Sequence, residues 1–214
     1  MIYLRAGVYA EGPSDYRFLC PLLDRYVDSL AASLFPGSYE VADTVGIDAP
    51  TKRKASRADR IAAAIVEYAD TCEMFVIHSD GEGDPEGASA SCIVPGVAAA
   101  RAAFTGRDVV TVACVPVREI EAWLLTDPDA FKTLLGSSFH PELPAEPEKE
   151  LDPKATLQKI LKDGRARPGP ESIHALFGER VRFEALRMLP AFRTFEVEMI
   201  GAIKRVAELQ GHRI

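Results

Sequence analysis

The stretch Val8-Tyr9-Ala10-Glu11-Gly12-Pro13-Ser14-Asp15 decides how the rest of the chain is interpreted. An apolar run over residues 3–10 ends on the carboxylate of Glu11, and a Gly-Pro turn then opens a segment with helical spacing of apolar residues. Pro13 suits the first position of a helix, because its missing N–H would have no partner there. The pattern predicts a strand, a tight turn and a helix, with Glu11 at the carboxyl end of the strand.

Asp15 follows four residues after Glu11, in the first turn of the predicted helix, so both carboxylates can face one crevice. In open α/β sheets, ligands bind at the carboxyl ends of the strands. Two neighbouring carboxylates repel each other unless a cation joins them. The alternative is that Glu11 is a surface loop residue and that Asp15 interacts only with the helix dipole. This segment alone favours neither interpretation.

Three further stretches, 39–45, 74–79 and 109–117, have the alternation or the β-rich apolar character of strands, and helical segments separate them. Strands that alternate with helices predict an α/β fold with a four-stranded parallel sheet and helices on both faces. Beyond residue 130 the chain is rich in prolines and short helical segments. We therefore expect an α/β core over residues 1–130 and an all-helical C-terminal extension over residues 131–214, packed on that core.

The third predicted strand runs directly into an acidic turn, Ser79-Asp80-Gly81-Glu82-Gly83-Asp84. The glycines let the backbone fold tightly, so that alternate side chains converge. Clusters of oxygen ligands suit Mg²⁺ or Mn²⁺. A polar turn without ligand is the alternative, and it explains one acid more easily than three. We expect Asp80, Glu82 and Asp84 to bind metal.

The fourth predicted strand also opens onto charged residues, in the stretch Arg118-Glu119-Ile120-Glu121. Taken alone, this stretch could be the charged surface of a helix. Right-handed crossovers, however, bring the ends of parallel strands to one edge of the sheet. Glu11, Asp80 and Glu119 should therefore gather there, and three acidic strand ends favour a functional site over unrelated surface acids.

The second predicted strand leads instead to a basic segment, which carries Lys52, Arg53, Lys54 and Arg57. This segment is either a solvated loop or a loop that contacts phosphate near the carboxylates, and both interpretations stay open.

Charge and composition narrow the classes of function. The 214 residues include 32 acidic and 25 basic ones, a net charge of −7, whereas domains that bind duplex DNA over a wide face are usually basic. The apolar runs are too short to span a membrane, and the first residues lack the order of a signal peptide. The four cysteines form no Cys-x-x-Cys pair, which argues against zinc and fits reduced thiols. We expect a cytoplasmic protein with no membrane partner.

Two short motifs resemble those of the Toprim domain, the metal-binding fold of topoisomerases, primases and related nucleases. Glu11-Gly12 is similar to its first motif, and Asp80-Gly81-Glu82 is similar to its Asp-x-Asp motif, with Glu82 in place of the second Asp. The pair Glu11 and Asp15 resembles the nuclease branch typified by the OLD family. Most of the chain, including residues 118–124, resembles an uncharacterised group of bacterial Toprim-like proteins.

The resemblance implies a Mg²⁺- or Mn²⁺-dependent site that transfers phosphoryl groups or cleaves phosphodiesters, in bacterial defence or DNA maintenance. The substrate would be nucleic acid, with DNA favoured over RNA. In such a site Asp80 and Glu82 bind the metal, Glu11 is a ligand or the general base, and Asp15 helps to hold a second ion. Arg118, or Lys54, would neutralise charge on the phosphate.

Two other functions remain open. One is a metal-dependent phosphatase of nucleotides or small phosphates, which the acidic net charge favours. The other is a non-catalytic module that keeps the fold and binds a partner protein.

Overall fold

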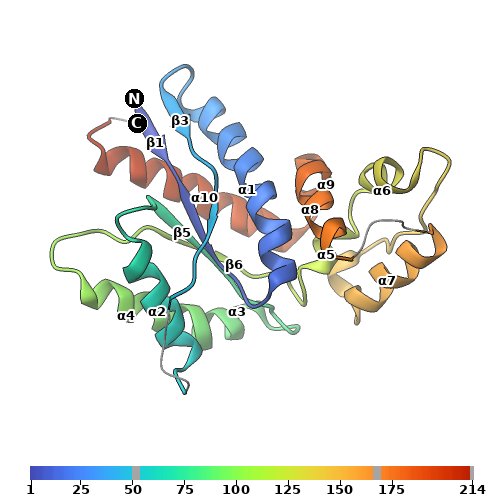
Figure 1. Ribbon diagram of the computed structural model, residues 1–214, viewed down its shortest axis with the longest axis horizontal. Coiled ribbons are helices and arrows are strands. Elements are labelled where there is room, and N and C mark those ends of the chain that lie inside the picture. The colour runs from blue at the N-terminus through green and yellow to red at the C-terminus, as the bar shows by residue number, and fades with distance from the viewer. Residues whose placement is uncertain (50–53, 166–169, 213–214) are drawn as a thin grey trace.

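Figure 1 shows the computed structural model, which describes residues 1–49, 54–165 and 170–212. Lys52 and Arg53 of the basic segment lie outside the described residues. Within these ranges no helix combines the length and the apolar character needed to cross a membrane.

The centre of the fold is a parallel sheet. This four-stranded sheet and a separate two-stranded one are formed by β1 (Ile2–Leu4), β2 (Ala6–Tyr9), β3 (Tyr39–Val41), β4 (Val45–Gly46), β5 (Met74–His78) and β6 (Thr111–Cys114). Four of them pair in the order β4-β2-β5-β6, and β1 pairs with β3, all in parallel. The predicted four-stranded parallel sheet is therefore confirmed.

Three of the four predicted strands differ from expectation in their extent. The first is divided into β1 and β2 at Arg5, whose carbonyl oxygen accepts from Glu73 N–H (3.0 Å) as the chain changes strand partner. The second is divided into β3 and β4, because the carboxylate of Asp24 takes the N–H of Thr44 (2.6 Å). β6 is shorter than 109–117, since the chain near Val117 turns to pair with the loop that follows β5.

The strand order places a switch point at the middle of the sheet. From β2 the chain moves outward to β4, and it then returns to place β5 on the other side of β2. In open α/β sheets, ligands bind in the crevice outside the carboxyl ends of the strands at such a point. Here that crevice lies beyond Tyr9 and His78, the last residues of β2 and β5.

Helices cover both faces of the sheet, as Figure 1 shows. α1 (Pro13–Leu34) and α10 (Pro190–Leu209) share a hydrophobic cluster with one set of strand side chains, including Val8 and Val76. α2 (Arg57–Tyr68) and α4 (Val94–Ala103) share another with the alternate set, including Tyr9 and Ile77. Burial on both faces is what an apolar parallel strand requires.

Short helices fill the rest of the chain. They are α3 (Pro85–Ala88), a π-helical turn (Ser89–Ile93), α5 (Glu121–Leu124), α6 (Pro128–Leu135), a 3₁₀ turn (Pro147–Lys149), α7 (Pro153–Asp163), α8 (Pro170–Arg180) and α9 (Phe183–Leu186). Beyond β6 the described residues form helices and loops only. In Figure 1, α6 and α7 lie farthest from the sheet, while α8 lies against α1.

Side-chain contacts tie the C-terminal helices to the sheet. The guanidinium of Arg25 in α1 donates to the carbonyl oxygens of Gly178 (2.8 Å) and Val181 (3.0 Å), which end α8. After α8 the chain returns to the sheet as α10. There the side-chain amide of Gln210 accepts from Tyr3 N–H (2.9 Å) and donates to the Tyr3 carbonyl oxygen (2.8 Å). The division at residue 130 stays a prediction.

Candidate functional site

Glu11 and Asp80 lie in contact at the switch point of the sheet. Glu11 follows β2 and Asp80 follows β5, and the Glu11 carboxylate oxygen Oε1 accepts from the backbone N–H of Asp80 (3.2 Å). The same oxygen accepts from the hydroxyl of Ser79 (3.3 Å). The structure thus brings together two acids that are 69 residues apart in the sequence.

Arg57 neutralises Glu11. Its guanidinium forms an ion pair with Glu11 Oε1 and donates through Nη2 to the carbonyl oxygen of His78 (2.9 Å), so it bridges the ends of β2 and β5. Burial raises the pKa of the Glu11 carboxyl, but the hydrogen bond and positive charge of Arg57 outweigh it, and the pKa is lowered overall. Glu11 is therefore ionised at neutral pH.

The N-terminus of α2 holds Arg57 in this position. Arg57 is the first residue of the helix, directly after the N-cap Ser56. The hydroxyl of Ser56 accepts from Asp59 N–H (3.1 Å), and the Asp59 carboxylate accepts from Ser56 N–H (3.0 Å). This reciprocal pair is a capping box, which fixes the start of a helix. A local sequence signal thus places the arginine beside Glu11.

His78 lies fully buried behind the acids. Its Nδ1 is 2.9 Å from the carbonyl oxygen of Cys114, so this nitrogen carries a proton. Its Nε2 faces Asp80 Oδ1 at 3.4 Å and Asp15 Oδ2 at 3.9 Å, and both of these oxygens can only accept. Burial lowers the pKa of His78, but Asp80, Cys114 and Asp15 raise it well above its ordinary value. The site therefore contains an imidazolium between two carboxylates.

Asp15 both caps α1 and faces the site. Its carboxylate accepts from the N–H of Gly12 (2.9 Å) and from the hydroxyl of Ser14 (3.2 Å). The residue is only 7% exposed. Burial raises the pKa of Asp15, and the opposing effects of His78 and the hydrogen bonds do not cancel that rise. Asp15 is thus more than a surface partner of the helix dipole.

The loop after β5 is joined to the loop after β6. Gly81 N–H donates to the carbonyl oxygen of Arg118 (2.8 Å), and Gly83 N–H donates to that of Val117 (2.7 Å). A Cβ atom at Gly81 would lie 2.7 Å from the Val117 carbonyl oxygen and still closer to that of Pro116. Only glycine allows this approach, which brings Arg118 and the following Glu119 toward the acids that follow β5.

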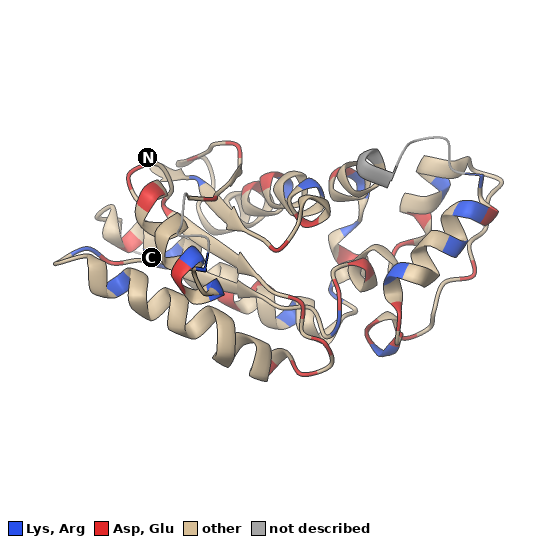
Figure 2. Ribbon diagram, turned by 60° about the horizontal axis from the view of Figure 1, so that its bottom comes forward, with Lys and Arg blue, Asp and Glu red and all other residues tan. Residues whose placement is uncertain are grey.

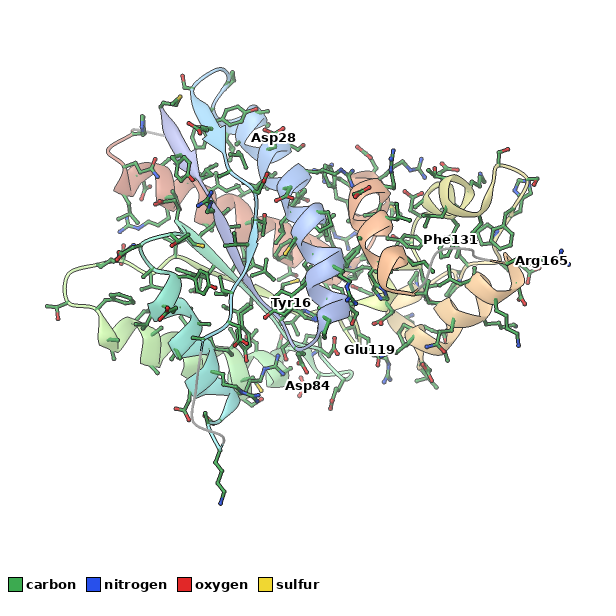
Figure 3. All side chains as sticks on the ribbon, in the orientation of Figure 1. Tyr16, Asp28, Asp84, Glu119, Phe131 and Arg165 are labelled. Atoms are coloured by element: carbon green, nitrogen blue, oxygen red, sulfur yellow. The ribbon has the colours of Figure 1, made fainter. Side chains whose placement is uncertain are left out.

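The other two acids of the turn after β5, Glu82 and Asp84, have surroundings that differ from those of Asp80. The carboxylate of Asp84 accepts from Gly87 N–H (3.0 Å) and caps α3. Glu82 is exposed and has a positive φ of 47°. The structure thus places Asp80 beside Glu11 and Asp15, while Glu82 and Asp84 lie on the outer part of the loop. Figure 3 places Asp84 and Glu119 at the same end of the sheet.

Glu119 brings a second partly buried carboxylate to the site. Its Oε2 is buried and has no hydrogen-bond partner. Burial and the negative charges of Glu121 and Asp80 raise the pKa of Glu119, although the backbone N–H of Lys154 in α7 donates to it. Glu119 Oε2 therefore has unused acceptor capacity at this edge, whereas Asp80 Oδ1 faces His78 Nε2 at 3.4 Å.

The charges around the site were only partly visible in the sequence. Arg57 was one of four basic residues in a segment with two open interpretations. Glu121 is 5% exposed and lies 3.6 Å from His174 Nε2 of α8, a contact with no local signal. An isolated histidine between a buried strand and an acidic turn was the one available hint of an imidazolium.

The carboxylate oxygens at this edge of the sheet are of the chemical type that binds a hard divalent cation. Asp80 and Glu119 supply carboxylate oxygens, which Mg²⁺ and Mn²⁺ prefer, and Glu119 Oε2 has no hydrogen-bond partner. Among the residues that the structure describes, however, no three His, Cys, Asp or Glu side chains are grouped so that they could hold a metal ion. Arg57 holds Glu11, and His78 faces Asp80.

Acidic and basic residues are mixed over the helices of the C-terminal part, as Figure 2 shows.

No family model matches the chain, and the comparisons with curated proteins and with solved structures found no significant match.

Proposed function

We propose that this chain is a divalent-metal-dependent, Toprim-like hydrolase that cleaves phosphodiester bonds at the carboxyl edge of its sheet. One observation carries the proposal: Glu11 and Asp80 are in contact at the switch point, and the carboxylate oxygen Oε2 of Glu119 is buried without a hydrogen-bond partner at the same edge of the sheet. The resemblance of Glu11-Gly12 and Asp80-Gly81-Glu82 to the Toprim motifs supports it.

A divalent ion bound there would polarise the phosphate and lower the pKa of a water molecule. Asp80 and Glu119 would hold it through their carboxylates, and the exposed Glu82 is available as a further donor. Glu11, ionised because its pKa is lowered, would serve as a ligand or accept a proton. His78, which also faces Asp15, would position the carboxylate of Asp80. Arg118, whose guanidinium lies beside Gly83, would face the phosphate.

The substrate that we propose is a nucleic acid, DNA before RNA, in defence or DNA maintenance. The net charge of −7 sets a condition on how such a substrate is bound. Few lysines and arginines would displace counterions, so binding should depend on the metal and only modestly on salt.

A metal titration followed by cleavage assays tests the proposal. We expect Mn²⁺ to bind in calorimetry, and we expect the protein to cut at least one of plasmid, single-stranded DNA or RNA, with cleavage abolished by chelator. Glu11→Gln should lose cleavage, because Gln keeps the size but not the charge. Glu73→Gln, at the opposite end of the sheet, is the matched control and should keep it. A protein that cuts none of these substrates with either ion, or a Glu11→Gln variant that cuts normally, would refute the proposal.

A further inference from the structure

A groove runs along the open side of β6, which is an edge strand of the four-stranded sheet. Among the described residues, β5 is the one strand that pairs with β6, and it lies on the other side. Ala113 and Val115 line the groove, whose volume is about 630 Å³. One wall is the first half of α10, and the other is α3 with the π-helical turn that leads into α4. Since α10 and α4 cover opposite faces of the sheet, the groove opens along its edge.

Backbone N–H groups of this edge point away from β5. The carbonyl oxygen of Cys114 accepts from the N–H of Ser79 (3.2 Å), directly after β5. In a trans peptide unit the N–H and the C=O point in opposite directions, so the N–H of Val115 points outward. The N–H of Ala113 points the same way, because it donates to the carboxylate of Glu198 in α10 (2.9 Å). Two outward donors, about 6.6 Å apart along the strand, are what a further strand would pair with.

Glu198 protects this edge without closing it. Its carboxylate takes the place on Ala113 N–H that a carbonyl oxygen of an added strand would occupy. Charged side chains on an edge are a common means of preventing unselective pairing. The Glu198 side chain is exposed, so it can turn to a new partner without breaking the core. An added strand that brings a cation for Glu198 is therefore favoured over one that does not.

The charge of the groove also favours a cationic partner. All three charged side chains of its lining are carboxylates: Asp84, Glu86 and Glu198. The guanidinium of Arg118 lies near Gly83 at one end but is not part of the lining. Between the acids the lining is mainly apolar, and Val94 is 57% exposed there. A ligand that fills the groove must therefore carry both apolar and basic side chains.

A second copy of this chain fits the groove less well than a basic segment. Antiparallel pairing of two β6 strands around Ala113 would place the two Glu198 side chains against each other. Like charges that face each other across paired strands are destabilising. Each copy also carries a net charge of −7.

We propose that the groove along β6 binds an extended segment of a partner protein, in which apolar residues alternate with Lys or Arg. The segment adds a strand to the sheet: main-chain hydrogen bonds to Ala113 and Val115 hold it, while Glu86 and Glu198 select its cations. This interaction goes beyond the proposed hydrolysis and does not depend on it, since neither Glu86 nor Val115 is part of the proposed metal site.

Fluorescence anisotropy with a short fluorescein-labelled peptide, in which lysine and valine alternate, tests the proposal. We expect the wild-type protein to bind it, and to bind a peptide with glutamate in place of lysine at least about tenfold more weakly. The lysine–valine peptide with its backbone nitrogens methylated keeps the charge but cannot pair as a strand. It should also bind at least about tenfold more weakly, because several main-chain hydrogen bonds are lost.

Two substitutions place the peptide in this groove. Glu86→Gln should weaken binding about two- to fivefold, whereas Glu67→Gln, which makes the same change of charge on the exposed face of α2, should leave it unchanged. Val115→Pro removes an outward N–H and should weaken binding about three- to tenfold. Proline is tolerated on edge strands where the N–H faces solvent, and circular dichroism checks that this variant is folded.

Failure of the wild-type protein to bind the lysine–valine peptide would overturn the proposal. Equal affinity for the methylated peptide would overturn it as well, and this comparison uses the wild-type protein, so it holds even if Val115→Pro does not fold. Equal losses in Glu86→Gln and Glu67→Gln would show attraction to the net charge alone. A wild-type dimer in sedimentation that Val115→Pro dissociates would show that the edge takes a second copy instead.

Discussion

Replacement of His78 by Gln removes the cation that lies between Asp15 and Asp80. The His78 side chain is fully buried, with Nε2 at 3.4 Å from Asp80 Oδ1 and 3.9 Å from Asp15 Oδ2. Gln is close to His in size and uncharged, so the substitution leaves two carboxylates without their shared partner. We expect the folded protein to be less stable, and the effect to depend on pH.

The structure sets the size of this effect. Removal of one partner from a buried ion pair costs about 3–5 kcal/mol. The Asp80 side chain is 31% exposed, and Asp15 keeps its hydrogen bonds from Gly12 and Ser14, so solvent and these donors stabilise the two charges in part. We therefore expect a loss of about 2–3 kcal/mol in the free energy of unfolding, a large share of the roughly 5–15 kcal/mol typical of a folded domain.

The pH dependence has a defined sign. The pKa of His78 is raised in the folded protein above its ordinary value, so the imidazolium stabilises the fold fully below the unfolded pKa of about 6.5. This stabilisation is lost as the pH rises through the folded pKa. Urea-induced unfolding should thus show the largest difference between wild type and His78→Gln near pH 6, and a smaller one near pH 9. His140→Gln, at an exposed loop residue, is the control and should show no such trend. A difference that does not change with pH, or no difference near pH 6, would refute the charged histidine.

Three further predictions concern other contacts. Gly81→Ala should lower the free energy of unfolding by about 2 kcal/mol, because it breaks the hydrogen bonds between the loops after β5 and β6. Gly201→Ala is the control, in the middle of α10 with open space around it, and should raise the free energy of unfolding by about 0.5–1 kcal/mol. Urea denaturation measures both changes. Asp127 is fully buried, and burial raises the pKa of its carboxyl, but Arg182 lowers this pKa overall. The ionised carboxylate therefore stabilises the fold above the unfolded pKa, and this stabilisation is lost as the pH falls through the folded pKa. Asp127→Asn should therefore lower stability at neutral pH and flatten the acid limb of the stability curve. Asp80→Asn should weaken Mn²⁺ binding in calorimetry at least about tenfold, and unchanged affinity would show that Asp80 is not a ligand.

The sheet and the meeting of its acidic ends could be predicted from the sequence. Short apolar runs followed by turns and helical segments define parallel strands, and the carboxyl ends of parallel strands share one edge. That is why Glu11 and Asp80 could be placed together. The limits of the strands could not be predicted, because the breaks at Arg5 and Thr44 depend on hydrogen bonds to partners elsewhere in the fold.

The counter-charges of the site could not be predicted either. The sequence shows acids near one another, and repulsion between them suggests a cation from solution. The fold instead supplies Arg57, 46 residues from Glu11, and His78, whose charge depends on Asp15 and on the Cys114 carbonyl. Such partners follow from the tertiary structure rather than from local spacing.

The local turn geometry after β5 determines where Glu82 and Asp84 lie. Alternate spacing with glycines predicted that Glu82 and Asp84 would converge with Asp80. Asp84 instead caps the next helix, and Glu82 adopts a positive φ on the exposed part of the loop. Asp is a preferred N-cap residue, so a Pro after Asp84, at the first position of α3, could have indicated this cap from the sequence.

The return of α10 to the sheet has a consequence for synthesis of the chain. The helix that covers β1, β5 and β6 on one face is synthesised after all of these strands, and Gln210 satisfies the backbone of Tyr3 from 207 residues away. Until residues 190–209 emerge, a nascent chain holds apolar strand side chains, such as Val112, without their cover. Contacts between such distant segments slow folding, and an exposed sheet face attracts other chains. The emergence of residues 190–209, rather than the completion of β6, is the step at which this fold can first close.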